Sequence, residues 1–163
     1  MEKVKVFEDS EIVEIQNFYD HEICFYSGMV GKDIIIPALA NDYKLSMRIV
    51  KSEIFNKNFL FTGLDGFGNH APLKICDAEM YRFLFGREDR TRHMCREFFT
   101  EILEIDDKSA FNDAVIFELI RTKSEANMCA KYITEIEDMD EWKQNILVAR
   151  CDYFLKGEVD NGN

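Results

Sequence analysis

The sequence predicts an α+β fold, with an N-terminal antiparallel sheet or partly open barrel packed against four to five C-terminal helices. In the first half, short apolar runs alternate with glycine-containing turns, a pattern typical of strands. In the second half, apolar residues recur at three- and four-residue spacing, which is typical of amphipathic helices. We expect a single domain over residues 1–163, strand-rich at 3–76 and helical at 77–156, with a short flexible tail at 157–163.

The first expected element is a β-hairpin. Two apolar runs, residues 22–26 and 32–36, flank a short connector that contains Gly28 and Gly31. Two glycines in so short a connector favour a hairpin turn. Pro37 lacks an amide hydrogen and is expected to end the second strand.

Three further runs extend the strand-rich half. Residues 43–50 alternate between apolar and mostly polar side chains, which predicts a half-buried antiparallel strand. Residues 58–62 form another short apolar run, and residues 73–76 are expected to be the last strand. The glycine-rich loop at 63–69 lies between these two runs, and its glycines are expected to adopt positive φ in a turn.

The helical half begins with a short helix ending at Phe85. Asp77 is its expected N-cap, and Gly86 follows its end, where glycine commonly stops a helix. Residues 90–105 carry apolar side chains at helical spacing and predict an amphipathic helix of about four turns.

Three more helices complete the expected fold. Ser109 is the expected cap of a third helix over 110–120, which is apolar on most sides and should be the most buried. A fourth is expected at 124–137. Residues 138–141 (Asp-Met-Asp-Glu) resemble a capping box and predict the start of a last helix, which ends before Gly157.

The charge distribution is uneven along the chain. The sequence has 31 acidic and 20 basic residues, a net charge of −11. Residues 101–163 carry 15 acidic and 7 basic side chains, whereas residues 32–100 carry 9 and 11. Such a surface repels nucleic-acid phosphates and attracts basic partners. We therefore expect a basic protein partner and no direct binding of nucleic acid.

Cysteine use and hydropathy indicate the compartment. The five cysteines lie at least 19 positions apart, without a CxxC pair, which favours reduced thiols over a disulfide framework or a zinc ribbon. The N-terminal residues have no apolar signal segment, and no run approaches the ~18 apolar residues of a membrane span. We expect a cytoplasmic protein that does not contact membranes.

The strongest candidate binding feature is a cluster of carboxylates between the last two expected helices, which we call the acidic junction. Its five carboxylates are Glu135, Glu137, Asp138, Asp140 and Glu141. One interpretation is a solvated surface, with the aspartates acting as helix caps. The other is complementarity to a basic protein surface, with Trp142 and nearby tyrosines as apolar anchors.

The second candidate feature is a cluster of arginines around His93. Its arginines are Arg82, Arg87, Arg90, Arg92 and Arg96. Guanidinium groups suit forked recognition of phosphate or carboxylate, and Arg92 and Arg96 would share one face of the expected helix. An anion or nucleotide site would then use Arg90, Arg92, Arg96 and His93. The competing interpretation is local ion pairing with neighbouring carboxylates.

No motif indicates a specific reaction. Residues 66–71 formally match GxGxxA, but Pro72 and an expected strand follow, where a dinucleotide site needs a helix. His93 and Glu97 give one HxxxE pair, which does not complete a metal site. No nucleophile elbow and no Walker loop is present in the sequence. We expect no cofactor, no metal and no enzymatic activity.

These features favour a protein-binding inhibitor of the toxin-immunity or anti-defence type. It would occlude a basic partner surface, such as the active site of a nuclease, through the acidic junction. The alternative is a domain that binds a small anion or nucleotide through the arginine cluster, with or without catalysis. A third possibility is a subunit of a larger assembly, which would leave phenylalanine-rich faces uncovered.

Overall fold

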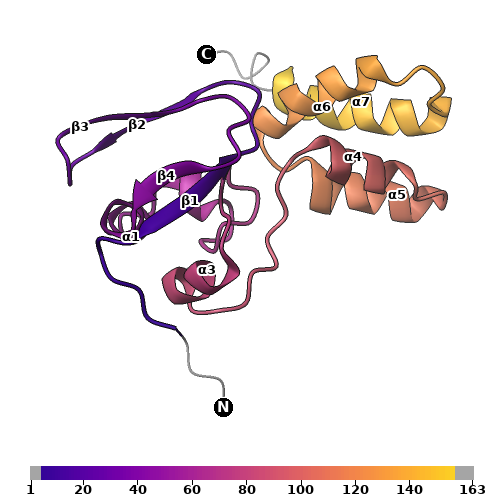
Figure 1. The fold of residues 1–163 in the computed structure, drawn as a ribbon. Helices are drawn as coiled ribbons and strands as arrows, with labels where there is room; N and C mark the ends of the chain where they lie inside the picture. The colour runs from indigo at the N-terminus through magenta and orange to yellow at the C-terminus, as the bar shows by residue number, and fades with distance from the viewer. Residues whose placement is uncertain (1–4, 157–163) are drawn as a thin grey trace. The chain divides into compact units, whose positions relative to one another are not determined.

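The computed structural model describes residues 5–156 (Figure 1) and confirms the α+β class. Antiparallel strands in two small open sheets are followed by a mostly helical second half. The sheets do not close into a barrel. The chain divides into two compact units, the first ending at His93 and the second starting at Met94. That the chain is a single domain remains a prediction, and the expected tail at 157–163 lies outside the described residues.

A three-stranded sheet forms the centre of the first unit. The middle strand β1 (Ile12–Asn17) pairs antiparallel with β4 (Tyr43–Ser46) on one side and β5 (Leu73–Ile75) on the other. Val13 and Ile15 of β1 are fully buried. The last strand is where the sequence predicted it, whereas the sequence analysis did not identify β1.

The predicted hairpin is confirmed as a separate two-stranded sheet. Strands β2 (Ile23–Ser27) and β3 (Lys32–Ile36) pair antiparallel, and Gly31 in the turn has a φ of 67°. Side chains alternate between two faces, as strand geometry requires. The inner face buries Phe25, and the outer face exposes Tyr26.

The strand predicted at 43–50 is correct only in its first half. It ends at Ser46, and helix α1 (Met47–Phe55) follows at once. The Ser46 hydroxyl accepts a hydrogen bond from the amide of Ile49, which caps the helix. Met47 and Val50 are fully buried three positions apart, so the helical period replaces the period of two.

The apolar run at 58–62 is also helical. Asn58 caps the short helix α2 (Phe59–Thr62), because its side-chain oxygen accepts from the amide of Leu60 at 3.1 Å. Phe61 is buried, and its ring meets the Phe25 ring edge to face at 5.6 Å. This contact joins α2 to the hairpin in one core.

Helix α3 (Ala78–Phe85) matches the prediction at both ends. The Asp77 carboxylate accepts from the amides of Glu79 and Met80, and Gly86 has a left-handed φ of 75°. The caps therefore define the two ends of this helix, and the buried ring of Tyr81 packs it against the rest of the unit.

The second unit is helical throughout its described residues. It contains α4 (Arg96–Leu103), α5 (Lys108–Ala114), the π-helical turn η1 (Val115–Leu119), α6 (Lys123–Glu135) and α7 (Glu141–Leu155). Figure 1 shows α6 and α7 alongside each other, with α4 and α5 packed next to them. None of the helices found between residues 5 and 156 is long and apolar enough to cross a membrane.

Helix α4 starts later than predicted. The expected helix at 90–105 begins only at Arg96, and residues 90–94 have no regular secondary structure. This segment stays extended because the side chain of His93 is buried and the amide of Thr91 bonds to the Asp89 carboxylate. The third helix is capped by Asp107, whose carboxylate bonds to the amide of Ala110, and not by Ser109.

The start of α6 and the cap of α7 also differ from expectation. Thr122 caps α6 by accepting from the amide of Glu125 at 3.1 Å, so this helix begins at Lys123. The capping box proposed at 138–141 is wrong. Helix α7 begins at Glu141, and its N-cap Asp140 makes no capping hydrogen bond through its side chain.

Lys143 is a buried cation within the second unit. Its ammonium group donates to the carbonyl of Leu103 at 2.5 Å and to Asp106 at 3.1 Å, and it lies between the rings of Phe111 and Trp142. The Leu103 carbonyl lies at the C-terminal end of α4, where helical carbonyls lack partners. The side chain therefore joins α7 to the end of α4.

We expect Lys143→Met to lower the free energy of unfolding by about 2 kcal/mol, because it removes both hydrogen bonds while keeping the buried stem. Urea denaturation would measure the loss. The matched control is Lys156→Met, which removes an exposed lysine and should change stability by less than about 0.5 kcal/mol. Equal stabilities of the two variants would contradict this role for Lys143.

Candidate functional site

The acidic junction occupies the connection between α6 and α7. Glu135 is the last residue of α6, Glu141 is the first of α7, and residues 136–140 join the two helices. All five carboxylates of the junction are exposed. The structure therefore brings the predicted carboxylates to one end of a helical pair.

One of the five carboxylates is already neutralised. Glu135 forms a two-pronged ion pair with Arg96, with N–O distances of 3.1 and 2.7 Å. The bonds to Glu135 raise the pKa of the Arg96 guanidinium above its usual value. Glu135 is thus engaged within the second unit and contributes less negative field than its neighbours.

The other four carboxylates of the junction form no ion pair among the described residues. Among residues 5–156, the side chains of Glu137, Asp138, Asp140 and Glu141 make no hydrogen bond or ion pair. Of the two aspartates interpreted as helix caps, Asp140 occupies the N-cap position of α7 but makes no capping hydrogen bond through its side chain, and Asp138 is not at a cap position. Four like charges within five residues repel one another, and within the described residues only the positive end of the α7 dipole, at Asp140 and Glu141, offsets part of that repulsion.

A second acidic cluster, at 101–107, gives a useful contrast. Asp106 pairs with the buried ammonium group of Lys143, and Asp107 caps α5. These carboxylates stabilise the fold, so their presence needs no partner. The junction differs because its four carboxylates make no ion pair and no capping hydrogen bond among the described residues.

The apolar neighbours of the junction differ from those expected. Trp142 is half-buried, and its ring packs edge to face on Phe111 at 5.4 Å, so most of it belongs to the core. Ile136, within the connection itself, is 39 % exposed. The sequence analysis missed Ile136 because an isolated isoleucine at a helix end resembles a core residue.

The arginine cluster does not gather on one helix. Arg92 precedes α4 and belongs to the first unit, whereas Arg96 is in α4 of the second, so the shared helical face expected for them is wrong. Arg90 pairs with Glu88 at 3.4 Å. Arg87 pairs with Asp65 at 3.1 Å and stacks over the Phe67 ring. An anion site at Arg90, Arg92, Arg96 and His93 remains a prediction.

A hollow of about 510 Å³ lies beside α3, next to two of these arginines. Arg82 and Arg87 line it, together with the carboxylates of Glu79, Glu88 and Asp89. Acidic groups outnumber basic ones there, so its charge does not favour an anion.

His93 is a structural residue within the first unit. Its Nδ1 lies 2.7 Å from the carbonyl of Ala71, its Nε2 lies 2.9 Å from the Thr91 hydroxyl, and its ring stacks on Phe18. Burial lowers the pKa of His93 from 6.5 to about 4. Because it lies outside α4, His93 does not form the helical HxxxE pair expected with Glu97. No three His, Cys, Asp or Glu side chains in the described range are placed to hold a metal ion.

The glycine-rich loop has no helix after it. Residues 71 and 72 lead directly into β5, so the loop lacks the helix N-terminus on which a dinucleotide pyrophosphate rests. Asp65 organises the loop by accepting hydrogen bonds from the amides of Phe67 and Asn69. The loop is a compact turn, and Gly63, Gly66 and Gly68 have positive φ, as predicted.

Comparisons of the chain with protein-family models, with curated proteins and with solved structures find no match in any of the three.

Proposed function

We propose that the protein is a protein-binding inhibitor of the toxin-immunity or anti-defence type. Through the acidic junction it covers a basic surface of its partner, such as the substrate-binding face of a nuclease. The carboxylates of Glu137, Asp138, Asp140 and Glu141 take the positions that substrate phosphates would occupy.

One observation carries this proposal. The four carboxylates are exposed, close together and without an ion pair or a side-chain capping hydrogen bond among the described residues. Within the Debye length of ~8 Å at physiological salt, their fields add and attract a basic surface. Exposed Ile136 supplies an apolar contact beside the charges. Interfaces commonly combine such a contact with a polar rim.

The first experiment is native mass spectrometry of the untagged protein, isolated from the cells that produce it. A complex with a basic protein is expected at low salt and should weaken at about 0.5 M salt, where the Debye length is roughly 4 Å. A lone chain at both salt concentrations would count against the proposal. The complex would also identify the partner for kinetic measurements.

Charge reversal then tests the surface. We expect simultaneous replacement of Glu137, Asp138, Asp140 and Glu141 by lysine to lower the association rate constant at least about tenfold at low salt, because electrostatic steering is lost. Stopped-flow or surface plasmon resonance would measure the rate. The unfolding transition should be only slightly lowered, because lysines at positions 140 and 141 meet the positive end of the α7 dipole while the core is untouched.

The matched control reverses four exposed carboxylates elsewhere, at Glu22, Asp33, Asp42 and Glu104. It changes the net charge equally, so a purely global effect would slow both variants alike. A slower association only in the junction variant supports the proposed surface. Equal rates for the junction variant and the wild type would refute it.

A further inference from the structure

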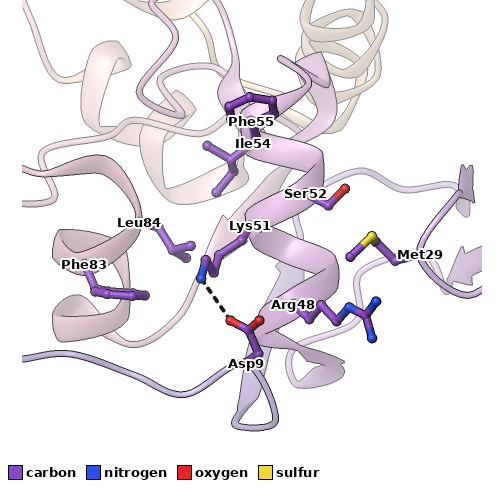
Figure 2. A pocket seen from close by; sticks show the side chains of 9 residues that line it. All are labelled: Asp9, Met29, Arg48, Lys51, Ser52, Ile54, Phe55, Phe83 and Leu84. Atoms are coloured by element: carbon purple, nitrogen blue, oxygen red, sulfur yellow. Dashed lines mark hydrogen bonds and ion pairs between the residues drawn. The ribbon is translucent and has the colours of Figure 1, made fainter.

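The first unit has a groove along the outer surface of α1, which we call the α1 groove (Figure 2). Its volume is about 480 Å³, within the range of small-molecule sites. Helix α3 lies on one side of it and the turn of the β2–β3 hairpin on the other, as Figure 2 shows. Three separate parts of the fold therefore enclose one surface.

The groove is lined mainly by apolar side chains. Met29 comes from the hairpin turn, Ile54 and Phe55 from α1, and Phe83 and Leu84 from α3. Phe55 is 85 % exposed, and Met29 is 38 % exposed. Phe83 and Leu84 are half-buried, so the exposed apolar side chains of the groove come from the hairpin turn and α1, and such neighbouring exposed groups are typical of a surface that binds an apolar group.

The charges of the groove leave one cation without a partner. Lys51 forms an ion pair with Asp9 at 2.9 Å, so these two side chains neutralise each other. The guanidinium group of Arg48 makes no hydrogen bond or ion pair with any residue between 5 and 156. In Figure 2 it extends from α1 on the side of Met29. Ser52, also in the lining, offers a hydroxyl group nearby.

We propose that the α1 groove binds a small amphipathic monoanion, an aryl or alkyl carboxylate. The apolar body lies against Phe55 and Met29, and the carboxylate accepts hydrogen bonds from Arg48. Guanidinium groups match carboxylates in geometry, and one unpaired cation suits one negative charge. The groove lies in the first unit, so this inference is independent of the acidic junction in the second.

Two-dimensional ¹H–¹⁵N NMR of the full chain tests the site with three probes. The probe 4-phenylbutyrate has both required parts, 4-phenylbutan-1-ol lacks the charge, and acetate lacks the apolar body. We expect 4-phenylbutyrate to shift the amides of Met29, Ser52 and Phe55 saturably. The alcohol should bind the same place about threefold to tenfold more weakly, and acetate should not saturate.

Substitutions distinguish the contribution of the charged contact from that of the apolar contact. Arg48→Gln should weaken 4-phenylbutyrate about threefold to tenfold and leave the alcohol unchanged. Phe55→Ser should weaken both, and because Phe55 is exposed the fold should remain intact. Arg90→Gln, an exposed arginine outside the groove, is the matched control and should have no effect.

Three results would overturn the proposal. The first is the absence of saturable shifts at the groove amides with 4-phenylbutyrate. The second is equal affinity for the acid and the alcohol together with no effect of Arg48→Gln, which would show an apolar patch without anion recognition. The third is saturable shifts that map away from α1.

Discussion

Replacing Gly63 with alanine is expected to lower the free energy of unfolding by about 3 kcal/mol or more. Gly63 ends α2 with φ 62° and ψ −156°, a conformation that residues with a side chain rarely adopt. An added Cβ would lie 2.1 Å from the carbonyl oxygen of Asn69. The loop must open to relieve this clash, although the amide of Leu64 bonds to the same carbonyl. Urea denaturation would measure the loss.

Gly66→Ala is the matched control in the same loop. Gly66 also has a positive φ, 81°, but no atom lies within 4 Å of an added Cβ. Only the cost of the left-handed backbone remains, which is about 1 kcal/mol. Equal losses for the two variants would show that the close approach of Gly63 to Asn69 is not important.

The second large effect expected is a pH dependence of stability caused by His93. Burial holds the pKa of His93 near 4 in the folded chain, against 6.5 when it is unfolded. Between these values the unfolded chain takes up a proton that the folded chain does not. The free energy of unfolding therefore falls as the pH is lowered from 6.5 to 4, by about 3 kcal/mol in total.

Denaturation curves at several pH values would measure this dependence. In His93→Gln the part contributed by residue 93 should disappear, whereas His21→Gln, which removes an exposed histidine, should retain that part. NMR titration of the ring reports the pKa directly. A value at or above 6.5 would contradict the prediction, and would mean that the link through Thr91 to the Asp89 carboxylate outweighs burial.

Asp89 titrates in a lower pH window. Its burial favours the neutral acid, but hydrogen bonds from Thr91 and the ion pair with Lys74 outweigh burial and hold its pKa below its usual value. Stability contributed by Asp89 is therefore present above pH 4 and is lost as the pH falls further. The contributions of His93 and Asp89 to the free energy of unfolding can be distinguished because they change over different pH ranges.

Much of the fold could be predicted where local chemistry decides it. The hairpin, β5, α3 and the existence of the later helices follow from glycine turns, helix caps and apolar spacing. Predictions were wrong where two periods compete. Residues 43–50 fit a period of two over eight residues, yet from Met47 onward burial follows the helical period. Strand β1 was not predicted because its apolar alternation is short. It becomes a central strand only through its pairing with β4 and β5.

The candidate site was predictable in its residues but not in their roles. The sequence shows where carboxylates and arginines cluster, and the acidic junction lies where the helix pattern placed it. The sequence cannot show which carboxylates act as caps, because a cap depends on where the helix begins. The α1 groove could not be predicted, because Met29, Phe55 and Phe83 meet only through tertiary contacts.

The isolation of the β2–β3 hairpin has a dynamic consequence. Its strands pair with each other and with no other strand among the described residues. The peptide groups on the outer edge of each strand therefore form no hydrogen bonds to a further strand. The inner face of the hairpin is buried, but without a third strand its outer peptide groups lack ladder hydrogen bonds, and such edges open before the centre of a domain. Amide hydrogens of residues 23–36 should therefore exchange with deuterium earlier than those of β1. Since Met29 lies in this turn, the hairpin forms the most adaptable wall of the α1 groove.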